Sequence, residues 1–363
     1  MKRGLAVALT LMSLGTASVV SLAAATVCLT SGCSTLGYYA QSIGGHLAIV
    51  RAARPVPDWQ ADAQTPAVLK ERLALSQRIR DYAVRELKQP DNASYRRYAV
   101  LYRSAAMWNV VAAPVLSLRL QTWCFRVVGC VGYRGYYTQA DADAFAQTLR
   151  AQGLEVSVYG VPAYSTLGLL PGAAFADPLL NTFIDYPQGE LARLIFHELA
   201  HQIAFAKGDT VFNESFATAV ERIGSERWLA DHADASHREE QARIEARRQD
   251  FRDLTARYRA EFEALYAGTA SDAAKRAAKL SLLERLRADH ASLKRERWGG
   301  YSGYDGWFLR ANNAAFGVLA AYTELVPDFE RLFEREGRNF TRFYAAVTRL
   351  AALPENERRA ALR

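Results

Sequence analysis

The chain lacks any block rich in Lys and Arg, although its formal net charge is +7 over 363 residues. Its basic residues are spread along the sequence and mixed with acidic ones, most densely between Arg238 and Arg297. An aromatic motif of the kind that reads RNA is also absent. Because nucleic-acid binding relies on clustered positive charge, we expect no nucleic-acid partner. Half of the residues are hydrophobic, which is enough for a globular protein with a substantial core.

Charged residues are also missing between positions 4 and 30, directly after a Lys-Arg pair. A short positive region followed by an apolar run is typical of an export signal. The segment ends in LTSGCS, which resembles the lipobox of bacterial lipoproteins. This resemblance implies cleavage before Cys33 and a lipid on that cysteine. We therefore expect a signal peptide over residues 1–32, a connector over 33–64, and membrane attachment through the lipid.

The same apolar run is long enough to stay uncleaved as a transmembrane anchor, since about 20 apolar residues span a bilayer. Both alternatives place the rest of the chain on the far side of the membrane. By analogy with lipoproteins, Ser34 directly after the cysteine implies the periplasmic face of the outer membrane. We therefore expect the protein in the cell envelope.

Cysteine is scarce, with four residues in the chain. Cys28 lies in the signal and Cys33 would carry the lipid, which leaves Cys124 and Cys130. Two remaining cysteines in an exported protein favour a disulfide that closes a small loop. A metal-binding pair is the alternative, but five residues separate the two and no histidine is near.

Hydrophobic spacing predicts an α+β fold that is mainly helical, with one large domain over residues 65–363. Helices are expected from Thr65-Pro66 to Pro90, over 140–152, over 188–206 and from 209 onward. Strands are expected within 115–131 and over 154–161, with a turn at 132–135.

Proline is absent from residues 233–298, and Gly268 is the only glycine there. The segment is dominated by Arg, Glu, Ala and Leu, which predicts a long charged helical hairpin that turns near Gly268. A solvated helix face accounts for most of this charge, although an arm that contacts a partner or substrate is the alternative. Closing helices are expected over 307–326 and 340–353.

Two of the six histidines stand in the motif His197-Glu198-Leu199-Ala200-His201. On a helix, residues four apart lie one turn apart on one face, so both imidazoles can bind one Zn²⁺. Glu198 points about 100° round the helix and is free to act as general base on a bound water. Two histidines buried on a helix face for packing alone would give the same spacing. The apolar residues that bracket the motif, and an acidic residue on the next helix, favour the metal site.

That acidic residue is Glu214, in the segment FNESFA at 212–217. The segment resembles the Asn-Glu-x-Phe-Ala stretch of the gluzincins, zinc peptidases whose third ligand is a Glu on a second helix. By this resemblance Glu214 is the third ligand, although only twelve residues separate it from His201, fewer than in those enzymes. A turn at Gly208 would bring the two level on antiparallel helices. Glu221 would come level with His197, either as the ligand or as a carboxylate that orients it.

The whole mature chain is similar to a family of predicted bacterial aminopeptidases, small zinc-peptidase-like lipoproteins. The matching stretches are GCSTLGYY at 32–39, the segment from Trp123-Cys124 to Tyr136, DPLLN at 177–181, the zinc motif, and NNA at 312–314. The resemblance implies a zincin-like core and peptidase activity with Zn²⁺ as cofactor and a peptide as substrate.

We therefore expect a zinc-dependent peptidase, favoured as an aminopeptidase. An envelope endopeptidase, or a non-catalytic envelope lipoprotein with structural zinc, is the alternative. The oligomeric state is left open. Candidates to stabilise an oxyanion are tyrosines in glycine-flanked loops, and each is more often a packing residue: Tyr133, Tyr136, Tyr301 and Tyr304. Asp177 and Asp305 are candidates to hold the substrate amine.

Overall fold

The computed structural model describes residues 37–125, 129–163, 166 and 175–363. The expected signal peptide and Cys33 lie outside these ranges. Among the described residues, no helix combines the length and apolar character needed to cross a bilayer. Residues 37–52 are helical, and the chain divides into two compact units, 1–48 and 49–363.

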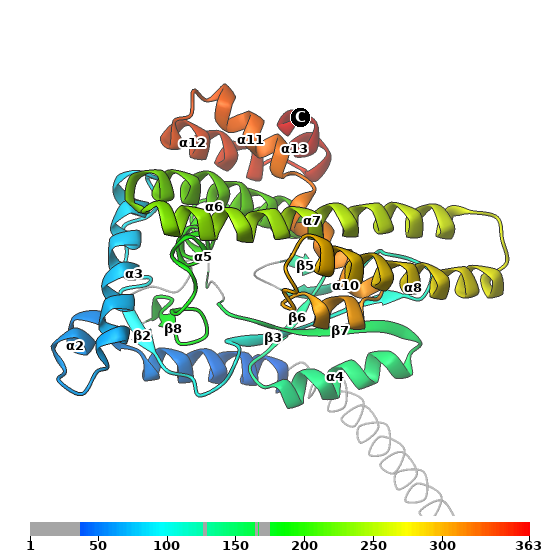
Figure 1. The fold of residues 1–363 in the computed structure, drawn as a ribbon, viewed down its shortest axis with the longest axis horizontal. Helices are drawn as coiled ribbons and strands as arrows, with labels where there is room; N and C mark the ends of the chain where they lie inside the picture. The colour runs from blue at the N-terminus through cyan, green and yellow to red at the C-terminus, as the bar shows by residue number, and fades with distance from the viewer. Residues whose placement is uncertain (1–36, 126–128, 164–165, 167–174) are drawn as a thin grey trace, which may run out of the picture. The chain divides into compact units, whose positions relative to one another are not determined.

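The second unit is mainly helical and carries small sheets, in agreement with the expected α+β class (Figure 1). Its helices are α2 (Val56–Ala61), α3 (Ala67–Arg85), α4 (Gln139–Ala151), α5 (Gln188–Ala200), α6 (Thr210–His232), α7 (Ala235–Ala267), α8 (Asp272–Glu296), α9 (Asp305–Arg310), α10 (Asn313–Thr323), α11 (Val326–Arg335), α12 (Phe340–Ala351) and α13 (Glu355–Leu362).

The main sheet is antiparallel in the order β6-β3-β7, formed by β3 (Met107–Pro114), β6 (Arg134–Tyr136) and β7 (Leu154–Val161). Side chains alternate between the two faces of a strand. Val111 and Ala113 pack on Ala314 of α10 on one face. Helix α4 packs against β3 and β7, and Figure 1 shows it on the side of the sheet opposite α10.

Two smaller sheets complete the described strands. One has the order β1-β2-β8, from β1 (Arg54–Pro55), β2 (Arg97–Ala99) and β8 (Leu179–Leu180). The other pairs β4 (Trp123–Phe125) with β5 (Gly129–Val131), and Cys124 faces Cys130 in this register. These two cysteines are joined by a disulfide, so the oxidised pair closes the β4–β5 hairpin.

Helices α5 and α6 lie at the centre of the largest hydrophobic core and pack against each other. Their contacts run in opposite directions along the chain, since His201 lies near Glu214 while His197 reaches Glu221. The pair is therefore antiparallel. Gly224 permits the close approach, because a Cβ there would lie 2.9 Å from the ring of Phe196 on α5.

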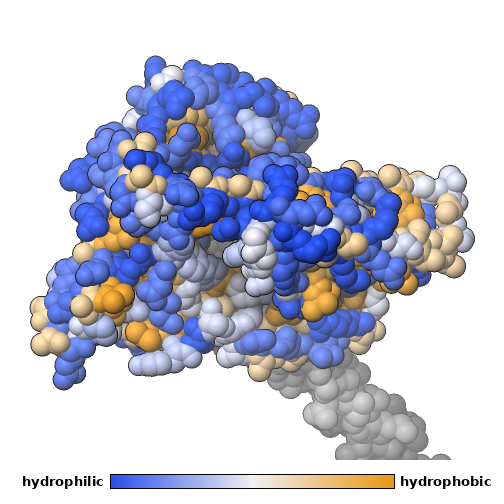
Figure 2. All heavy atoms as spheres, in the orientation of Figure 1, coloured by the Kyte–Doolittle hydropathy of each residue, from blue (hydrophilic) through white to orange (hydrophobic). Residues whose placement is uncertain are grey.

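The expected hairpin consists of α7 and α8. Asp234 caps the start of α7 by accepting from the amide of His237 at 2.9 Å, and Ser271 caps α8 in the same way. Buried aromatic and aliphatic side chains between these helices, α9 and α10 form a second core around Phe262 and Leu286. In Figure 2 the surface of the hairpin mixes hydrophilic and apolar residues, and its tip is less hydrophilic than the part nearer the body of the protein.

Several boundaries differ from the sequence-based expectation. The central strand β3 begins within residues 94–111, where the sequence allows either a helix or a strand, and β6 lies where a turn was expected. The predicted closing helix over 307–326 is broken at Ala311 into α9 and α10. Residues expected to form a connector contribute Ile49, Ala53 and Val56 to the largest core, so the compact unit begins before residue 65.

Candidate metal centre

The turn between α5 and α6 is held by side chains of α6 itself. The side-chain nitrogen of Asn213 donates to the carbonyl oxygen of Ala206 at 2.9 Å. The side-chain oxygen of Asn213 accepts from the backbone N–H of Ala206 at 2.7 Å. Because these backbone groups are bound to a side chain, they are unavailable to a longer α5, which ends at Ala200 rather than at the expected 206. Gly208 adopts a φ of 81° in the turn, a conformation that glycine takes without strain.

Asp209 fixes the first turn of α6. Its carboxylate accepts from the amide of Phe212 at 3.0 Å and forms ion pairs with Arg358 at 3.1 Å and Arg359 at 2.7 Å. The aspartate side chain is 3% exposed, so these contacts lie inside the protein. The C-terminal helix α13 therefore anchors the helix that carries Glu214 and Glu221.

Three donor atoms from these two helices converge. Nε2 of His197 lies 3.2 Å from Nε2 of His201, and Oε2 of Glu214 lies 3.3 Å from the first and 3.7 Å from the second. Each of the three side chains is at most 13% exposed. The twelve-residue spacing between His201 and Glu214 thus brings both to one point.

These donors fit a divalent cation. Tetrahedral zinc with bonds of about 2.1 Å to nitrogen and oxygen requires its ligand atoms to lie about 3.4 Å apart. The three observed separations lie close to this value. Two imidazoles and one carboxylate are also the donor types that zinc accepts. Within the described residues, this is the group of His, Cys, Asp and Glu side chains that can hold a metal ion.

Glu221 contacts the opposite edge of the His197 ring. Its Oε2 lies 2.9 Å from Nδ1 of His197, and its Oε1 accepts from Arg193. Against the effect of burial, the charge of Arg193 and the hydrogen bond to His197 lower the pKa of Glu221 to about 2. An ionised Glu221 holds a proton on Nδ1 and turns Nε2 toward the other donors. The alternative that Glu221 is itself one of the three converging ligands has no support in this geometry.

The pKa values of the two histidine rings shift in opposite directions. Burial opposes a charge on His197, but hydrogen bonds to Glu214 and Glu221 outweigh it and raise its pKa well above the usual value. Burial lowers the pKa of His201 to about 4. His201 is therefore neutral near pH 7 and presents an unprotonated nitrogen to a metal ion.

Arg193 connects this centre to the hairpin helix α7. Its Nη1 atom lies 3.0 Å from Glu245 of α7, and Glu245 also pairs with Arg248 and Arg252 at 2.6 Å each. Arg248 in turn contacts Glu190 at the start of α5. Because the Arg193 side chain is 10% exposed, its pairing with Glu221 is shielded from water and is stronger than a surface ion pair.

Glu198 is not one of the converging donors, as its position in the motif predicts. Burial raises the pKa of its carboxyl to about 7. The charge of His197 lowers that pKa, while the negative charges of Glu214 and Asp177 raise it. A carboxyl with this pKa can take up and release a proton near neutral pH.

Tyr159 on β7 is a residue near the centre that sequence reasoning did not single out. Burial raises the pKa of its hydroxyl to about 12, the hydrogen bond with Asn109 on β3 lowers it, and the charge of Glu214 raises it. The alternation along the strand predicts that Tyr159 and Val158 point to opposite faces of the sheet. It does not show which helix covers each face. Only the packing of α6 beside the sheet identifies this tyrosine.

The tyrosine and aspartate candidates separate into two groups. Tyr301, Tyr304 and Asp305 belong to the hairpin side: Tyr304 stacks on Phe251, and Asp305 pairs with Lys294. Tyr304 therefore packs against the second core, while Tyr301 and the side chain of Asp305 are exposed at its edge.

The other three candidates, Asp177, Tyr133 and Tyr136, lie outside this group. Asp177 is buried, accepts from the amide of Thr166, and lies near enough to Glu198 to influence its pKa. Tyr136 pairs through β6 with Trp108, and Tyr133 lines a cavity next to α6.

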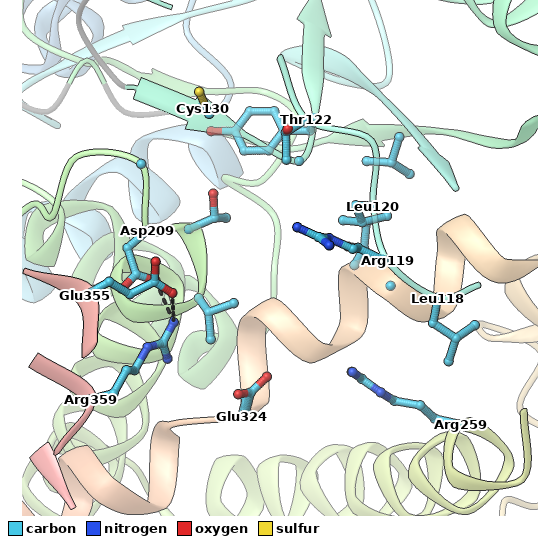
Figure 3. A pocket seen from close by; sticks show the side chains of 18 of the residues that line it. Leu118, Arg119, Leu120, Thr122, Cys130, Asp209, Arg259, Glu324, Glu355 and Arg359 are labelled. Carbon is cyan, nitrogen blue, oxygen red and sulfur yellow. Dashed lines mark hydrogen bonds and ion pairs between the residues drawn. The ribbon is translucent and has the colours of Figure 1, made fainter. Parts of the chain in front are cut away.

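This cavity has a volume of about 390 Å³, within the range of small-molecule sites (Figure 3). Tyr159, Thr210 and Val211 line it, so it includes the turn of α6 that precedes Glu214. Thr210 precedes Glu214 by about one helical turn, a rise of about 5.4 Å, although none of the three converging donors lines the cavity itself. Its remaining wall comes from β3, the loop after it, α7, α10 and α13.

A family model with the description "Putative aminopeptidase" matches residues 37–362, nearly the whole chain. No curated protein and no solved structure gives a significant match.

Proposed function

Because the chain belongs to the family described as "Putative aminopeptidase", we propose that it is a zinc-dependent peptidase that removes residues from the amino ends of peptides. The observation that carries the proposal is the convergence of the donor atoms of His197, His201 and Glu214. The carboxyl group of Glu198 lies near them but is not one of the converging donors. Three protein ligands leave one position for water, which is the arrangement of catalytic rather than structural zinc.

In this proposal His197, His201 and Glu214 hold the ion. Zinc supplies a Lewis acid that lowers the pKa of a bound water toward about 7 and polarises a carbonyl group. Glu221 keeps the Nδ1 proton of His197 in place, so that ring offers Nε2 without rearrangement. Arg193 keeps Glu221 ionised and oriented.

Glu198 is the proposed general base. Its raised pKa of about 7 matches the proton affinity required to accept a proton from an activated water and return it to the leaving amine. The Tyr159 hydroxyl, with a pKa of about 12, stays protonated and can donate a hydrogen bond. Because Tyr159 lines the cavity beside the first turn of α6, a substrate lying there would meet its hydroxyl.

We also propose that the protein works in the cell envelope, attached through a lipid on Cys33. The disulfide between Cys124 and Cys130 supports an oxidising compartment, since such bonds are rare in the cytosol. The peptide substrate would then be one available outside the cytoplasm.

Replacement of Glu198 by Gln tests the catalytic role. Glu198→Gln should keep zinc and the fold but lower hydrolysis of aminoacyl and internally quenched peptides by at least about a hundredfold. Metal content is measured on the same preparations. A Glu198→Gln protein that hydrolyses peptides as fast as the wild type would exclude this mechanism, and unblocked peptides cut no faster than amino-blocked ones would exclude the aminopeptidase form.

A further inference from the structure

The charged side chains that line the 390 Å³ cavity do not all have partners. Arg359 pairs with Asp209 at 2.7 Å and lies 3.8 Å from Glu355, and Arg358, which does not line the cavity, also pairs with Asp209 at 3.1 Å. Two guanidinium groups therefore balance these two acids. Arg259 donates to Glu263 at 2.9 Å through Nε, which leaves its two terminal amino groups available. No hydrogen bond or ion pair engages the guanidinium of Arg119 among the described residues.

In Figure 3 the side chains of Arg119 and Arg259 point into the hollow from the right of the view, and Glu324 lies to the left of Arg259. Like Arg119, Glu324 has no ion-pair partner among the side chains that the structure describes. Because Arg259 pairs with Glu263, Arg119 and Glu324 are the charged lining residues that have no ion-pair partner among the described side chains. The apolar part of the wall is formed by Val111, Leu118, Leu120, Val211 and Val318.

The backbone that carries Arg119 is held in place. Its neighbour Leu118 is buried, and Leu120 packs on Gly317 of α10, where a Cβ would come within 2.7 Å of both the Leu118 carbonyl and the Leu120 side chain. The amide of Gln121 donates to Ala112 of β3 at 2.8 Å. A guanidinium on a fixed backbone loses less entropy when it binds than one on a mobile loop.

We propose that this cavity binds a carboxylate of the peptide substrate and that Arg119 is the residue that selects it. The planar guanidinium offers two parallel N–H donors, which match the two oxygens of a carboxylate. The proposal rests on the peptidase function above, because the cavity lies one helical turn from Glu214. The carboxylate has two possible sources: the C-terminus of a short peptide, or an Asp or Glu side chain.

The test compares three tripeptides with the zinc-loaded protein: Ala-Ala-Ala, its C-terminal amide, and Ala-Ala-Glu-amide. Loss of a charged hydrogen bond corresponds to about a ten- to hundredfold change in kcat/KM, so the plain amide should be poorer by that factor. If the C-terminus is the source, Ala-Ala-Ala should react faster than both amides; if a side chain is the source, Ala-Ala-Glu-amide should react faster than both alanine peptides.

Arg119→Gln should remove the preference for the carboxylate, and Arg119→Lys should restore part of it because charge returns without the planar fork. Glu324→Gln is the matched control, and it should leave the preference in place or strengthen it. Equal rates on all three peptides in the wild type would overturn the proposal. A preference that survives in Arg119→Gln but disappears in Glu324→Gln would overturn it too, because selection would then depend on Glu324 and not on Arg119.

Failure of the peptidase function can be separated from failure of this proposal. The Glu198→Gln protein is titrated calorimetrically with Ala-Ala-Ala and with its amide, with and without Arg119→Gln. Binding of the free acid that depends on Arg119, without hydrolysis by the wild type, supports the cavity and excludes the peptidase. Hydrolysis without any dependence on Arg119 supports the peptidase and excludes the cavity as a carboxylate site.

Discussion

Nδ1 of His197 lies 2.9 Å from Oε2 of Glu221, one and a half to two helical turns beyond Glu214 on the partner helix. This contact assigns different roles to the two glutamates of α6. Glu214 faces Nε2 of both histidines, whereas Glu221 holds the other nitrogen of one ring. The predictions below follow from this division and from the ion pairs that support it.

Glu214→Gln and Glu221→Gln should weaken zinc binding to different degrees. Loss of an outer carboxylate that orients a ligand lowers metal affinity by roughly 10- to 100-fold, and loss of a ligand should lower it further. Zinc dissociation constants from competition with a chromophoric chelator measure both. Equal effects, or a larger loss for Glu221→Gln, would reverse the two roles.

Arg193→Gln should lower zinc affinity through Glu221, although Arg193 is not among the proposed ligands. Without the guanidinium, the buried Glu221 carboxylate loses its charged partner and holds His197 less firmly. We expect a loss of about tenfold or more in zinc affinity, with partial rescue by Arg193→Lys.

Arg243 on α7 provides the control, since its pair with Glu239 is exposed to solvent. Arg243→Gln should leave zinc affinity unchanged, because an exposed ion pair contributes less than about 1 kcal/mol. An identical effect of both substitutions would show that Arg193 acts only on general stability.

Chelation of the metal should lower thermal stability. A ligand present at a thousand times its dissociation constant stabilises the folded state by about 4 kcal/mol, which corresponds to a shift in Tm of roughly 8 °C. Differential scanning calorimetry with and without a chelator measures the shift. The Glu214→Gln protein should show little of it, and a full shift in that variant would place the stabilising ion elsewhere.

Asp209→Ala should strongly destabilise the protein. It leaves Arg358 and Arg359 without their buried carboxylate, and loss of one partner from a buried pair costs about 3–5 kcal/mol. Asp234→Ala removes an exposed helix cap on α7 and should cost only about 1 kcal/mol. Urea unfolding monitored by circular dichroism compares the two, and similar losses would contradict the anchoring role of α13.

Local patterns in the sequence were sufficient to predict strand β7 and the α7–α8 hairpin. The alternation over 154–161 predicts β7, and this prediction is confirmed residue for residue. The absence of proline and the single glycine predict the α7–α8 hairpin, which turns at Gly268 as expected. Such patterns work because helix and strand periodicity depend on neighbours close in sequence.

Contacts between distant segments explain the errors. Residues 134–136 form a strand because β3 is available beside them, and no local signal distinguishes this strand from a turn. The early end of α5 depends on Asn213, which lies in the next helix. Ile49 and Val56 join the core because α3 and α6 offer apolar surface there.

The sequence alone determined that two histidines share one face of a helix and that a glutamate between them points elsewhere. It also limited the third ligand to Glu214 or Glu221. Tertiary structure decided between them, because the turn at Gly208 sets which glutamate stands level with both Nε2 atoms. It alone brought Arg193, Tyr159 and Arg119 to their places, since each meets partners or cavity walls from segments far away in the chain, and no spacing along the sequence encodes such distances.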